Sequence, residues 1–335
     1  MIIAVDAMGG DYAPSEIVKG AAQGSKLHGV DVILVGDEAK IRPHLSAEFA
    51  KSTSVTIQHA AEAIGMDEHA SAVRTKRDAS VVVAASLVKE GKADAMVSVG
   101  NTAAAMAVAT LRLGRISGID RPAIAAVMPS GSGATVLLDA GAVVDCSVDN
   151  LKQFAVMGGV YAEKVLSIDR PRIGLLSVGE EKSKGNELIR AAHEELAAMP
   201  VNFIGNVEGH DLFSGVADVI VTDGFAGNVA LKTAEGLAEY LKKLIQDELR
   251  ARPLAIVPIA LLKPFLNSIK NRLDYSEYGG APLLGLNGVC IIGHGRSNAH
   301  AVANAVKAAR EAVNGGVVAA IQSTLERASG TPVCS

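Results

Sequence analysis

A regular alternation between short apolar segments and longer amphipathic segments constrains the fold of this chain more than any other feature. Short segments that are mostly apolar and bounded by Gly, Asp or Asn are predicted to be strands: Met1–Ala7, Val30–Gly36, Val55–His59, Ala95–Val99, Ala123–Met128, Thr135–Asp139, Ile173–Val178, Phe203–Asn206, Val219–Thr222 and Val289–Ile292. Continuously apolar strands are typical of a sheet that is covered on both faces.

Helical periodicity fills many of the intervals between these strands. The predicted helices are Ser15–Leu27, Ala72–Lys89, Thr102–Leu113, Leu151–Leu166, Asn186–Met199, Asn228–Arg250 and Ala299–Ala328. Alternation of this kind favours an α/β fold with a largely parallel central sheet, helices on both faces, and ligand sites at the carboxyl ends of the strands. No internal repeat or Ser/Gly-rich linker divides the sequence, so we expect residues 1–335 to form one α/β unit, either undivided or made of two interwoven lobes.

Composition excludes several classes of protein. The chain has 49% hydrophobic and 20% charged residues, enough apolar surface for one or two cores and too much for a disordered protein. A net charge of −4 and an aromatic content of 3% argue against nucleic acid as a partner. The three separated cysteines fit a reducing cytoplasm better than a disulfide framework or a zinc site. The N-terminus resembles a strand more than a signal peptide, and no apolar run reaches the ~18 residues of a membrane span.

Familiar catalytic motifs are missing from the sequence. It contains no phosphate-binding GxxxxGK[ST] loop, no GxGxxG, no GxSxG and no HExxH. Gly293-His-Gly295 resembles the start of a dinucleotide loop, but Asn298 stands at the third glycine position. The eight histidines include no pair at metal-ligand spacing on one helix face. No base lies near Cys146 in sequence, so we expect a packed small side chain there and not a nucleophile.

Four polar, glycine-rich segments follow predicted strands: Asp6–Asp11, Ser98–Thr102, Gly179–Asn186 and Thr222–Asn228. Each combines backbone N–H groups, a capping side chain and a helix N-terminus, which together bind anions. One such loop is more often only a capped turn, but four in one chain favour a crevice that binds phosphate. A basic cluster, Arg74, Lys76 and Arg77, is expected at a helix start, where an anionic partner or a solvated helix face would explain it.

A basic and apolar segment lies between residues 250 and 274. Three prolines interrupt it, so a single straight helix is not expected: Pro253, Pro258 and Pro264. It is too short to span a bilayer, but its composition suits an interfacial element that rests on anionic lipid. A core or dimer-interface helix pair with solvated ends is the other interpretation.

The glycine-rich loops also carry a resemblance. The sequence closely resembles the phosphate acyltransferases of bacterial phospholipid synthesis (fatty acyl-acyl carrier protein:phosphate acyltransferases). The matching stretches are Asp6–Pro14, Ser98–Thr102, Gly118–Pro122, Gly179–Glu181, Lys184–Asn186, Asp223–Asn228, Leu231–Thr233 and Tyr278–Gly280. Two positions depart from the family pattern: Ala103, where Gly is common, and Val143, where Asn is usual. The second puts Asp139–Asp145 in doubt as a contact loop.

The resemblance implies a fold similar to the isocitrate and isopropylmalate dehydrogenases, with a protruding amphipathic helical tip near 250–274. It implies that inorganic phosphate attacks the thioester of a long-chain acyl-acyl carrier protein, giving acyl phosphate for phosphatidic acid synthesis. It further implies a cytoplasmic homodimer that attaches to the inner face of the cell membrane and supplies a membrane glycerol-3-phosphate acyltransferase. Neither a metal nor an organic cofactor is implied.

Little acid–base catalysis is needed for such a reaction. Phosphate is already anionic near neutral pH, and a thiol with a pKa near ~8.5 leaves without a strong acid. The barrier falls mainly when the reactants are held together and the developing oxyanion is stabilised. Amide-rich loops with one lysine are suited to that task.

The expected site residues follow from these loops. Lys184, with Asn186, would neutralise phosphate or the tetrahedral intermediate, and Asn101 with Thr102 would donate to the anion. Asn228 would complete the oxyanion site, while Asp223 would orient Lys184 or cap its own turn. Other expected phosphate or substrate contacts are Gly9, Gly10, Asp11, Gly100, Gly185, Gly224 and Gly227. Membrane or carrier-protein contacts are expected from Arg250, Arg252, Leu261, Leu262, Lys263, Phe265 and Lys270.

Two other functions compete with this one. An isocitrate-type dehydrogenase would need clustered metal-binding aspartates and an adenine-binding loop, which the sequence does not display. A membrane-surface scaffold that binds acidic partners through residues 250–274 would leave the four anion-binding loops unexplained.

Overall fold

A computed structural model describes residues 1–45, 54–251 and 279–328. The expected helical tip near 250–274 therefore lies almost wholly outside the described residues, and so do Arg252, Leu261, Leu262, Lys263, Phe265 and Lys270. Arg250 is described: its side chain is exposed and lies 3.7 Å from Asp247 in an ion pair within one helical turn.

One sheet of eleven strands runs through the molecule in the order β3-β2-β1-β4-β11-β10-β5-β6-β9-β7-β8. The strands are β1 (Ile2–Asp6), β2 (Asp31–Gly36), β3 (Val55–His59), β4 (Ala95–Ser98), β5 (Ala123–Ser130), β6 (Gly133–Leu138), β7 (Ile173–Leu176), β8 (Phe203–Val207), β9 (Val219–Val221), β10 (Ala281–Leu284) and β11 (Val289–Ile292). All pairings are parallel except those of β10 with β11, β10 with β5, and β5 with β6. The predicted α/β class and its largely parallel sheet are confirmed.

All ten predicted strands are present, with ends shifted by at most two residues, and β10 was missed. Its sequence is short and contains Pro282, a residue that usually argues against an internal strand because it cannot donate to the ladder. Pro282 is nevertheless paired with Ile291, and β10 joins the two halves of the sheet.

The α-helices are α1 (Ser15–His28), α2 (Glu38–Ile41), α4 (Ser80–Lys89), α5 (Thr102–Leu113), α6 (Val148–Lys164), α7 (Glu187–Ala197), α8 (Gly224–Ala251), α11 (Ala299–Asn314) and α12 (Val317–Ala328). Short 3₁₀ turns add η1 (Arg42–His44), η2 (Ala70–Arg74) and η3 (Gly209–Leu212). Among these described helices, none is both long and apolar enough to cross a membrane.

Two predicted helices were wrong in extent. The single helix expected over Ala72–Lys89 is divided into η2 and α4 by an intervening turn. The helix expected over Ala299–Ala328 is divided at Gly315 and Gly316, where Gly316 has φ of +60°. A Cβ on Gly315 would lie 2.8 Å from the Lys164 carbonyl oxygen, so close approach to α6 requires glycine at the break.

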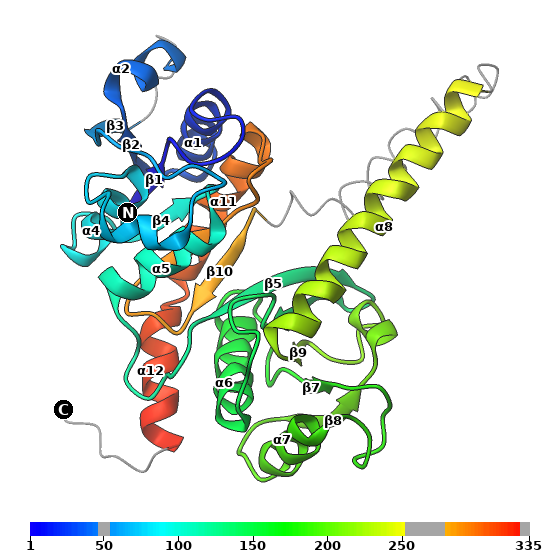
Figure 1. Ribbon diagram of the computed structural model, residues 1–335. Coiled ribbons are helices and arrows are strands. Elements are labelled where there is room, and N and C mark those ends of the chain that lie inside the picture. Colours follow the sequence, from blue (N-terminus) through cyan, green and yellow to red (C-terminus); the bar gives the residue numbers. More distant parts are fainter. Residues whose placement is uncertain (46–53, 252–278, 329–335) are drawn as a thin grey trace.

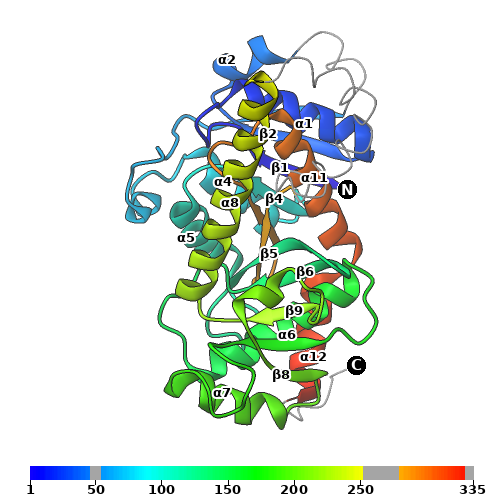
Figure 2. The same ribbon diagram turned by 90° about the vertical axis from the view of Figure 1, so that its right-hand side faces the viewer.

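The sheet and its helices form two lobes, which Figures 1 and 2 show one above the other with β5 and β10 between them. The first lobe contains β1 to β4 and β11 with α1, α2, α4, α5 and α11. The second contains β5 to β9 with α6 and α7, and α8 begins there and extends away from it. Three clusters of buried apolar side chains form the core. One packs α1 and α11 against the first lobe's strands, and another contains the buried faces of α4 and α5. The third contains the buried faces of α6, α7 and α12 in the second lobe.

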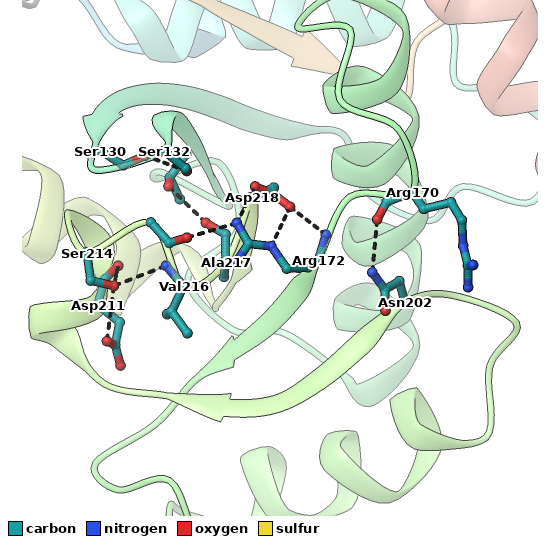
Figure 3. A network of polar contacts seen from close by, with 12 residues as sticks. Ser130, Ser132, Arg170, Arg172, Asn202, Asp211, Ser214, Val216, Ala217 and Asp218 are labelled. Atoms are coloured by element: carbon teal, nitrogen blue, oxygen red, sulfur yellow. Dashed lines mark hydrogen bonds and ion pairs between the residues drawn. The ribbon is translucent and has the colours of Figure 1, made fainter.

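A polar network fixes the amino ends of β7 and β9 in the second lobe (Figure 3). The Arg172 guanidinium donates to both carboxylate oxygens of Asp218, at 3.0 and 2.9 Å, and to the Gly215 carbonyl at 2.8 Å. Burial raises the pKa of Asp218, but the hydrogen bonds and charge of Arg172 outweigh burial and leave that pKa below its usual value. Because this network lies at the amino ends of the strands, it supports the lobe away from the loops described next.

Candidate active site

In the first lobe, the loops after β1 and β4 lie against each other. The buried Asp6 carboxylate accepts hydrogen bonds from the Met8 N–H at 3.3 Å and from the Ser98 hydroxyl at 2.8 Å. A Cβ on Gly9 would lie 2.6 Å from Asp6 Oδ2 and 2.8 Å from Gly100 Cα, so this close approach requires glycine. Burial raises the pKa of Asp6, which the hydrogen bonds partly oppose. Asp6 thus organises two of the predicted anion-binding loops.

Asn101 is fully engaged by its own protein. Its side-chain oxygen accepts from the Ala104 N–H at 3.0 Å and caps α5, and its NH₂ group donates to the carbonyls of Met66 and Glu68 at 2.9 and 2.8 Å. The amide of Asn101 therefore joins the 65–68 loop to the start of α5. The neighbouring Thr102 is exposed, and it leaves a hydroxyl at the same helix N-terminus.

The other predicted positions in the first lobe, Gly10 and Asp11, contact the loop after β11. The Asp11 N–H donates to the Gly295 carbonyl at 2.8 Å, and the Asp11 side chain is exposed. Gly10 has φ of +102°, and a Cβ there would lie 3.1 Å from that same carbonyl. Both residues are thus placed beside the loops after β1, β4 and β11.

In the second lobe, the loop after β6 surrounds the buried carboxylate of Asp139. This carboxylate accepts backbone N–H groups at 2.6 to 3.1 Å, from Ile124, Gly141, Ala142 and Val143. Burial raises the pKa of Asp139, while these donors lower it. The sequence had put Asp139–Asp145 in doubt as a contact loop, yet the loop packs directly on the start of α8.

One hydrogen bond and two close approaches at glycines define how the loop after β6 packs against α8. The Gly224 N–H donates to the Val143 carbonyl at 2.8 Å. A Cβ on Gly227 would lie 1.9 Å from the Asp139 carbonyl oxygen, and a Cβ on Gly141 would lie 3.4 Å from the Asn228 side chain. Asp223 accepts from the Ala226 N–H at 2.8 Å, so it caps its own turn, one of the two roles expected for it. Asn228 itself is exposed.

The loop after β7 carries Lys184. Its side-chain stem packs over Gly179, where a Cβ would lie 3.0 Å from Lys184 Cγ, and the residue is exposed. Asn186 caps α7 by accepting from the Ile189 N–H at 2.9 Å, and Gly185 has φ of +91°. β7 pairs with β9, so this loop and the 222–228 loop follow neighbouring parallel strands at one edge of the sheet.

A buried side chain that the sequence did not single out holds the Lys184 loop. Asn206 donates to the Glu181 carbonyl at 3.0 Å, and this same carbonyl accepts the Lys184 N–H at 2.9 Å. The Asn206 side-chain oxygen in turn lies 3.0 Å from His193 Nδ1. No motif marks Asn206, because its role depends on β8 lying beside β7 in space.

An open cavity of about 930 Å³ lies between the two lobes. The α5 side of the cavity consists of Thr102, Ala103, Met106, Ala107, Thr110 and Leu111, and residues 141–145 of the loop after β6 lie opposite. Of the predicted catalytic side chains and Thr102, only Thr102 lines the cavity. Lys184, Asn101 and Asn228 do not line it, although Asn228 lies next to Gly141, which does. The structure thus brings the start of α5 and the loop after β6 to one cleft, which the loop that carries Lys184 does not line.

Two further predictions are settled by local contacts. The basic cluster does not open a helix: Arg74 ends η2, and Lys76 pairs with Glu68 at 2.6 Å in the turn before α4. Only Arg74 of the three lines the cavity. Cys146 donates from its thiol to the Val143 carbonyl at 3.3 Å, and burial raises its pKa to about 11, so it is a packed thiol as expected.

Comparisons with known proteins agree with this arrangement. The family model described as "Fatty acid synthesis protein" matches residues 1–320. A curated relative from Desulforamulus reducens, named phosphate acyltransferase, is 52% identical over 329 residues, which cover 98% of each chain. A phosphotransacetylase from Streptococcus pyogenes superimposes with a TM-score of 0.60 at 20% identity, over 97% of this chain and 94% of its own.

A second solved structure shares the fold. A 4-hydroxythreonine-4-phosphate dehydrogenase from Klebsiella pneumoniae gives a TM-score of 0.53 at 16% identity, over 93% of this chain and 99% of its own. At these identities the two structures are evidence for the fold alone. Acyl-transferring enzymes and dehydrogenases share this fold. The curated relative and the family model, which both span nearly the whole sequence, show that this chain belongs to the phosphate acyltransferase family.

Proposed function

We propose that this protein transfers a long-chain acyl group from acyl-acyl carrier protein to inorganic phosphate. The observation that carries the proposal is the cavity between the lobes, at which the N-terminus of α5 faces the loop after β6. The names of the curated relatives support transfer to phosphate. The identity of the donor rests on the family resemblance of the loops that surround this cleft.

The chemistry requires little beyond positioning and charge. A phosphate oxygen attacks the thioester carbonyl carbon, and the resulting tetrahedral oxyanion collapses with cleavage of the C–S bond. The electron pair leaves on sulfur, and the proton of HPO₄²⁻ ends on the carrier thiol, so that acyl phosphate and free thiol are the products. Every step benefits from fixed N–H donors and from a nearby cation.

The proposed roles divide between the lobes. In the first lobe, the Thr102 hydroxyl and the N-terminal amides of α5 would stabilise the oxyanion. In the second lobe, Lys184 would neutralise phosphate, and the exposed Asn228 with the amides at the start of α8 would complete its binding site. Within the described ranges, no carboxylate is paired with the Lys184 ammonium, which supports a role in binding an anion. The loops around Gly9, Gly100 and Gly224 supply the fixed backbone.

The proposed partners follow from the surface. The protein would act as a homodimer at the inner face of the cell membrane and would deliver acyl phosphate to a membrane glycerol-3-phosphate acyltransferase. Exposed apolar side chains along α8 support a contact surface of this kind: Leu237, Tyr240, Leu241, Leu244 and Ile245. Exposed Arg74 and Arg121 beside the cavity are consistent with an anionic carrier protein.

Release of free thiol from palmitoyl-acyl carrier protein, with and without inorganic phosphate and without added metal, tests the proposal. We expect release that depends on phosphate and produces one acyl phosphate for each thiol. Phosphate-independent release would instead indicate a thioesterase. No release by a folded protein would favour the scaffold function.

A further inference from the structure

We infer that the cavity between the lobes is the groove for the hydrocarbon chain of the acyl donor, and that side chains on one face of α5 set the accepted chain length. This inference rests on the proposed function and deepens it. The described residues contain a cleft whose lining is largely apolar.

The lining of the cavity has helical periodicity. The α5 residues occur in pairs four residues apart, Thr102 with Ala103, Met106 with Ala107 and Thr110 with Leu111, so they form one continuous stripe along the helix. The stripe spans nine residue steps, which at 1.5 Å per residue is about 13 Å. A narrow stripe of this length fits an extended chain better than a compact ring.

Chemical character changes along this stripe. Its first end is the N-terminus of α5, where the Thr102 hydroxyl and the positive end of the helix dipole favour a developing negative charge. Its other end includes Leu111, which lines the cleft and is 60% exposed. The thioester carbonyl is therefore assigned to the Thr102 end and the methyl terminus to the Leu111 end.

The opposite wall and the rim agree with a hydrocarbon occupant. Val143 and Val144 face the stripe from the loop after β6, and Val144 exposes 58% of its surface. The charged residues of the lining, Arg74, Arg121 and Asp145, are all exposed, so they do not introduce a buried charge into the groove. Large exposed apolar side chains that gather in one cleft mark a binding surface.

The test compares three variants that narrow the groove at successive turns of α5: Ala103→Phe, Ala107→Phe and Leu111→Trp. Each is assayed for phosphate-dependent thiol release from acyl-acyl carrier proteins with chains from butyryl to stearoyl. For the wild type, kcat/KM should rise about fourfold for each added methylene until the groove is full, and then level off.

The acyl-chain length at which kcat/KM stops rising should be shortest for Ala103→Phe, intermediate for Ala107→Phe and longest for Leu111→Trp. Ala191→Phe, at an exposed position on α7 outside the cavity, is the matched control and should keep the wild-type profile. Retained transfer from the butyryl donor by Ala107→Phe and Leu111→Trp shows that these variants are folded. For Ala103→Phe, an unchanged thermal unfolding midpoint gives the same control.

The possible failures are distinguishable. If the wild type transfers acyl groups but the three variants keep its chain-length profile, or lose all donors equally while still folded, the groove is elsewhere and the proposed function stands. If the wild type transfers no acyl group to phosphate from any donor, the proposed function fails and this inference fails with it.

Discussion

The two lobes use buried polar groups in the same way but expose different chemistry. In the first lobe, Asp6 accepts from the Ser98 hydroxyl and the Met8 N–H, and Asn101 is engaged by backbone groups, so the loops after β1 and β4 are fixed and few side-chain donors remain. In the second lobe, Asp139 and Asn206 fix the loops, and the side chains of Lys184 and Asn228 remain exposed. In the proposed reaction, the first lobe would therefore contribute backbone amides with the Thr102 hydroxyl, and the second lobe would contribute the side chains of Lys184 and Asn228.

The largest effect is expected at Lys184. Lys184→Ala should lower phosphate-dependent thiol release by at least about 100-fold, because loss of a charge that stabilises the transition state typically costs 10² to 10³. Its stability should change by less than about 0.5 kcal/mol, because the side chain is exposed. Lys182→Ala, an exposed lysine in the same loop, is the control. If Lys184→Ala and Lys182→Ala had equal activity, the second lobe would not contribute the Lys184 side chain to the reaction.

A backbone change in the first lobe should lower stability more than removal of the Asn101 side chain does. Gly9→Ala places a Cβ 2.6 Å from Asp6 Oδ2 and 2.8 Å from Gly100 Cα, and relief requires backbone movement. We expect a loss of about 2 kcal/mol in the free energy of unfolding by urea. Gly209→Ala, where a Cβ meets open space, is the matched control. A neutral Gly9→Ala would show that the first-lobe loops are not tightly fixed.

Substitutions of Asn101 test whether its side chain has a structural or a catalytic role. Asn101→Ala removes a helix cap and the donors to the 65–68 loop, so stability should fall by about 1.5 kcal/mol, while activity of the folded protein falls less than tenfold. Asn101→Asp retains the capping oxygen and should recover part of that stability. A loss of activity as large as that of Lys184→Ala would assign Asn101 to the reaction after all.

The smallest effect is expected at the amino ends of the second lobe's strands. The pKa of Asp218 is lowered, so its ion pair with Arg172 contributes stability above the ordinary carboxyl pKa, and that contribution disappears as pH falls through the folded-state pKa. Asp218→Asn should lower stability by about 1 kcal/mol at pH 7, since Arg172 is partly exposed, and by nearly nothing near pH 2. Thermal melts across pH measure this difference. Altered turnover by the folded variant would connect the network to the reaction.

Much of the fold could be predicted because it depends on local patterns. Continuous apolar runs predicted ten strands, and the polar turns after them predicted which edge of each half of the sheet carries the loops. β10 was not predicted because Pro282 disfavours a strand locally. The strand is stabilised only by its pairing with β11 on one side and β5 on the other. The break between η2 and α4 was not predicted because no glycine or proline marks it in the sequence.

The site was harder to predict because partners come from distant parts of the chain. Sequence alone shows that Asn101 begins a helix, but not that residues 65–68 take up its NH₂ group. It shows no reason to choose Asn206, which acts on the Lys184 loop through a carbonyl 25 residues away. It also does not show that residues 139–145 form a loop whose backbone N–H groups surround the Asp139 carboxylate.

The length of α8 has a mechanical consequence. Its 28 residues form a rod about 42 Å long, with Asn228 in the first turn beside the cleft and Arg250 at the far end. A force or a rotation applied at Arg250 is transmitted to Asn228 through one continuous ladder of backbone hydrogen bonds. Gly236 lies part-way along, with open space where its Cβ would be, so it is the natural position for the rod to bend. Contacts made near Arg250 can therefore change the position of Asn228 beside the cleft.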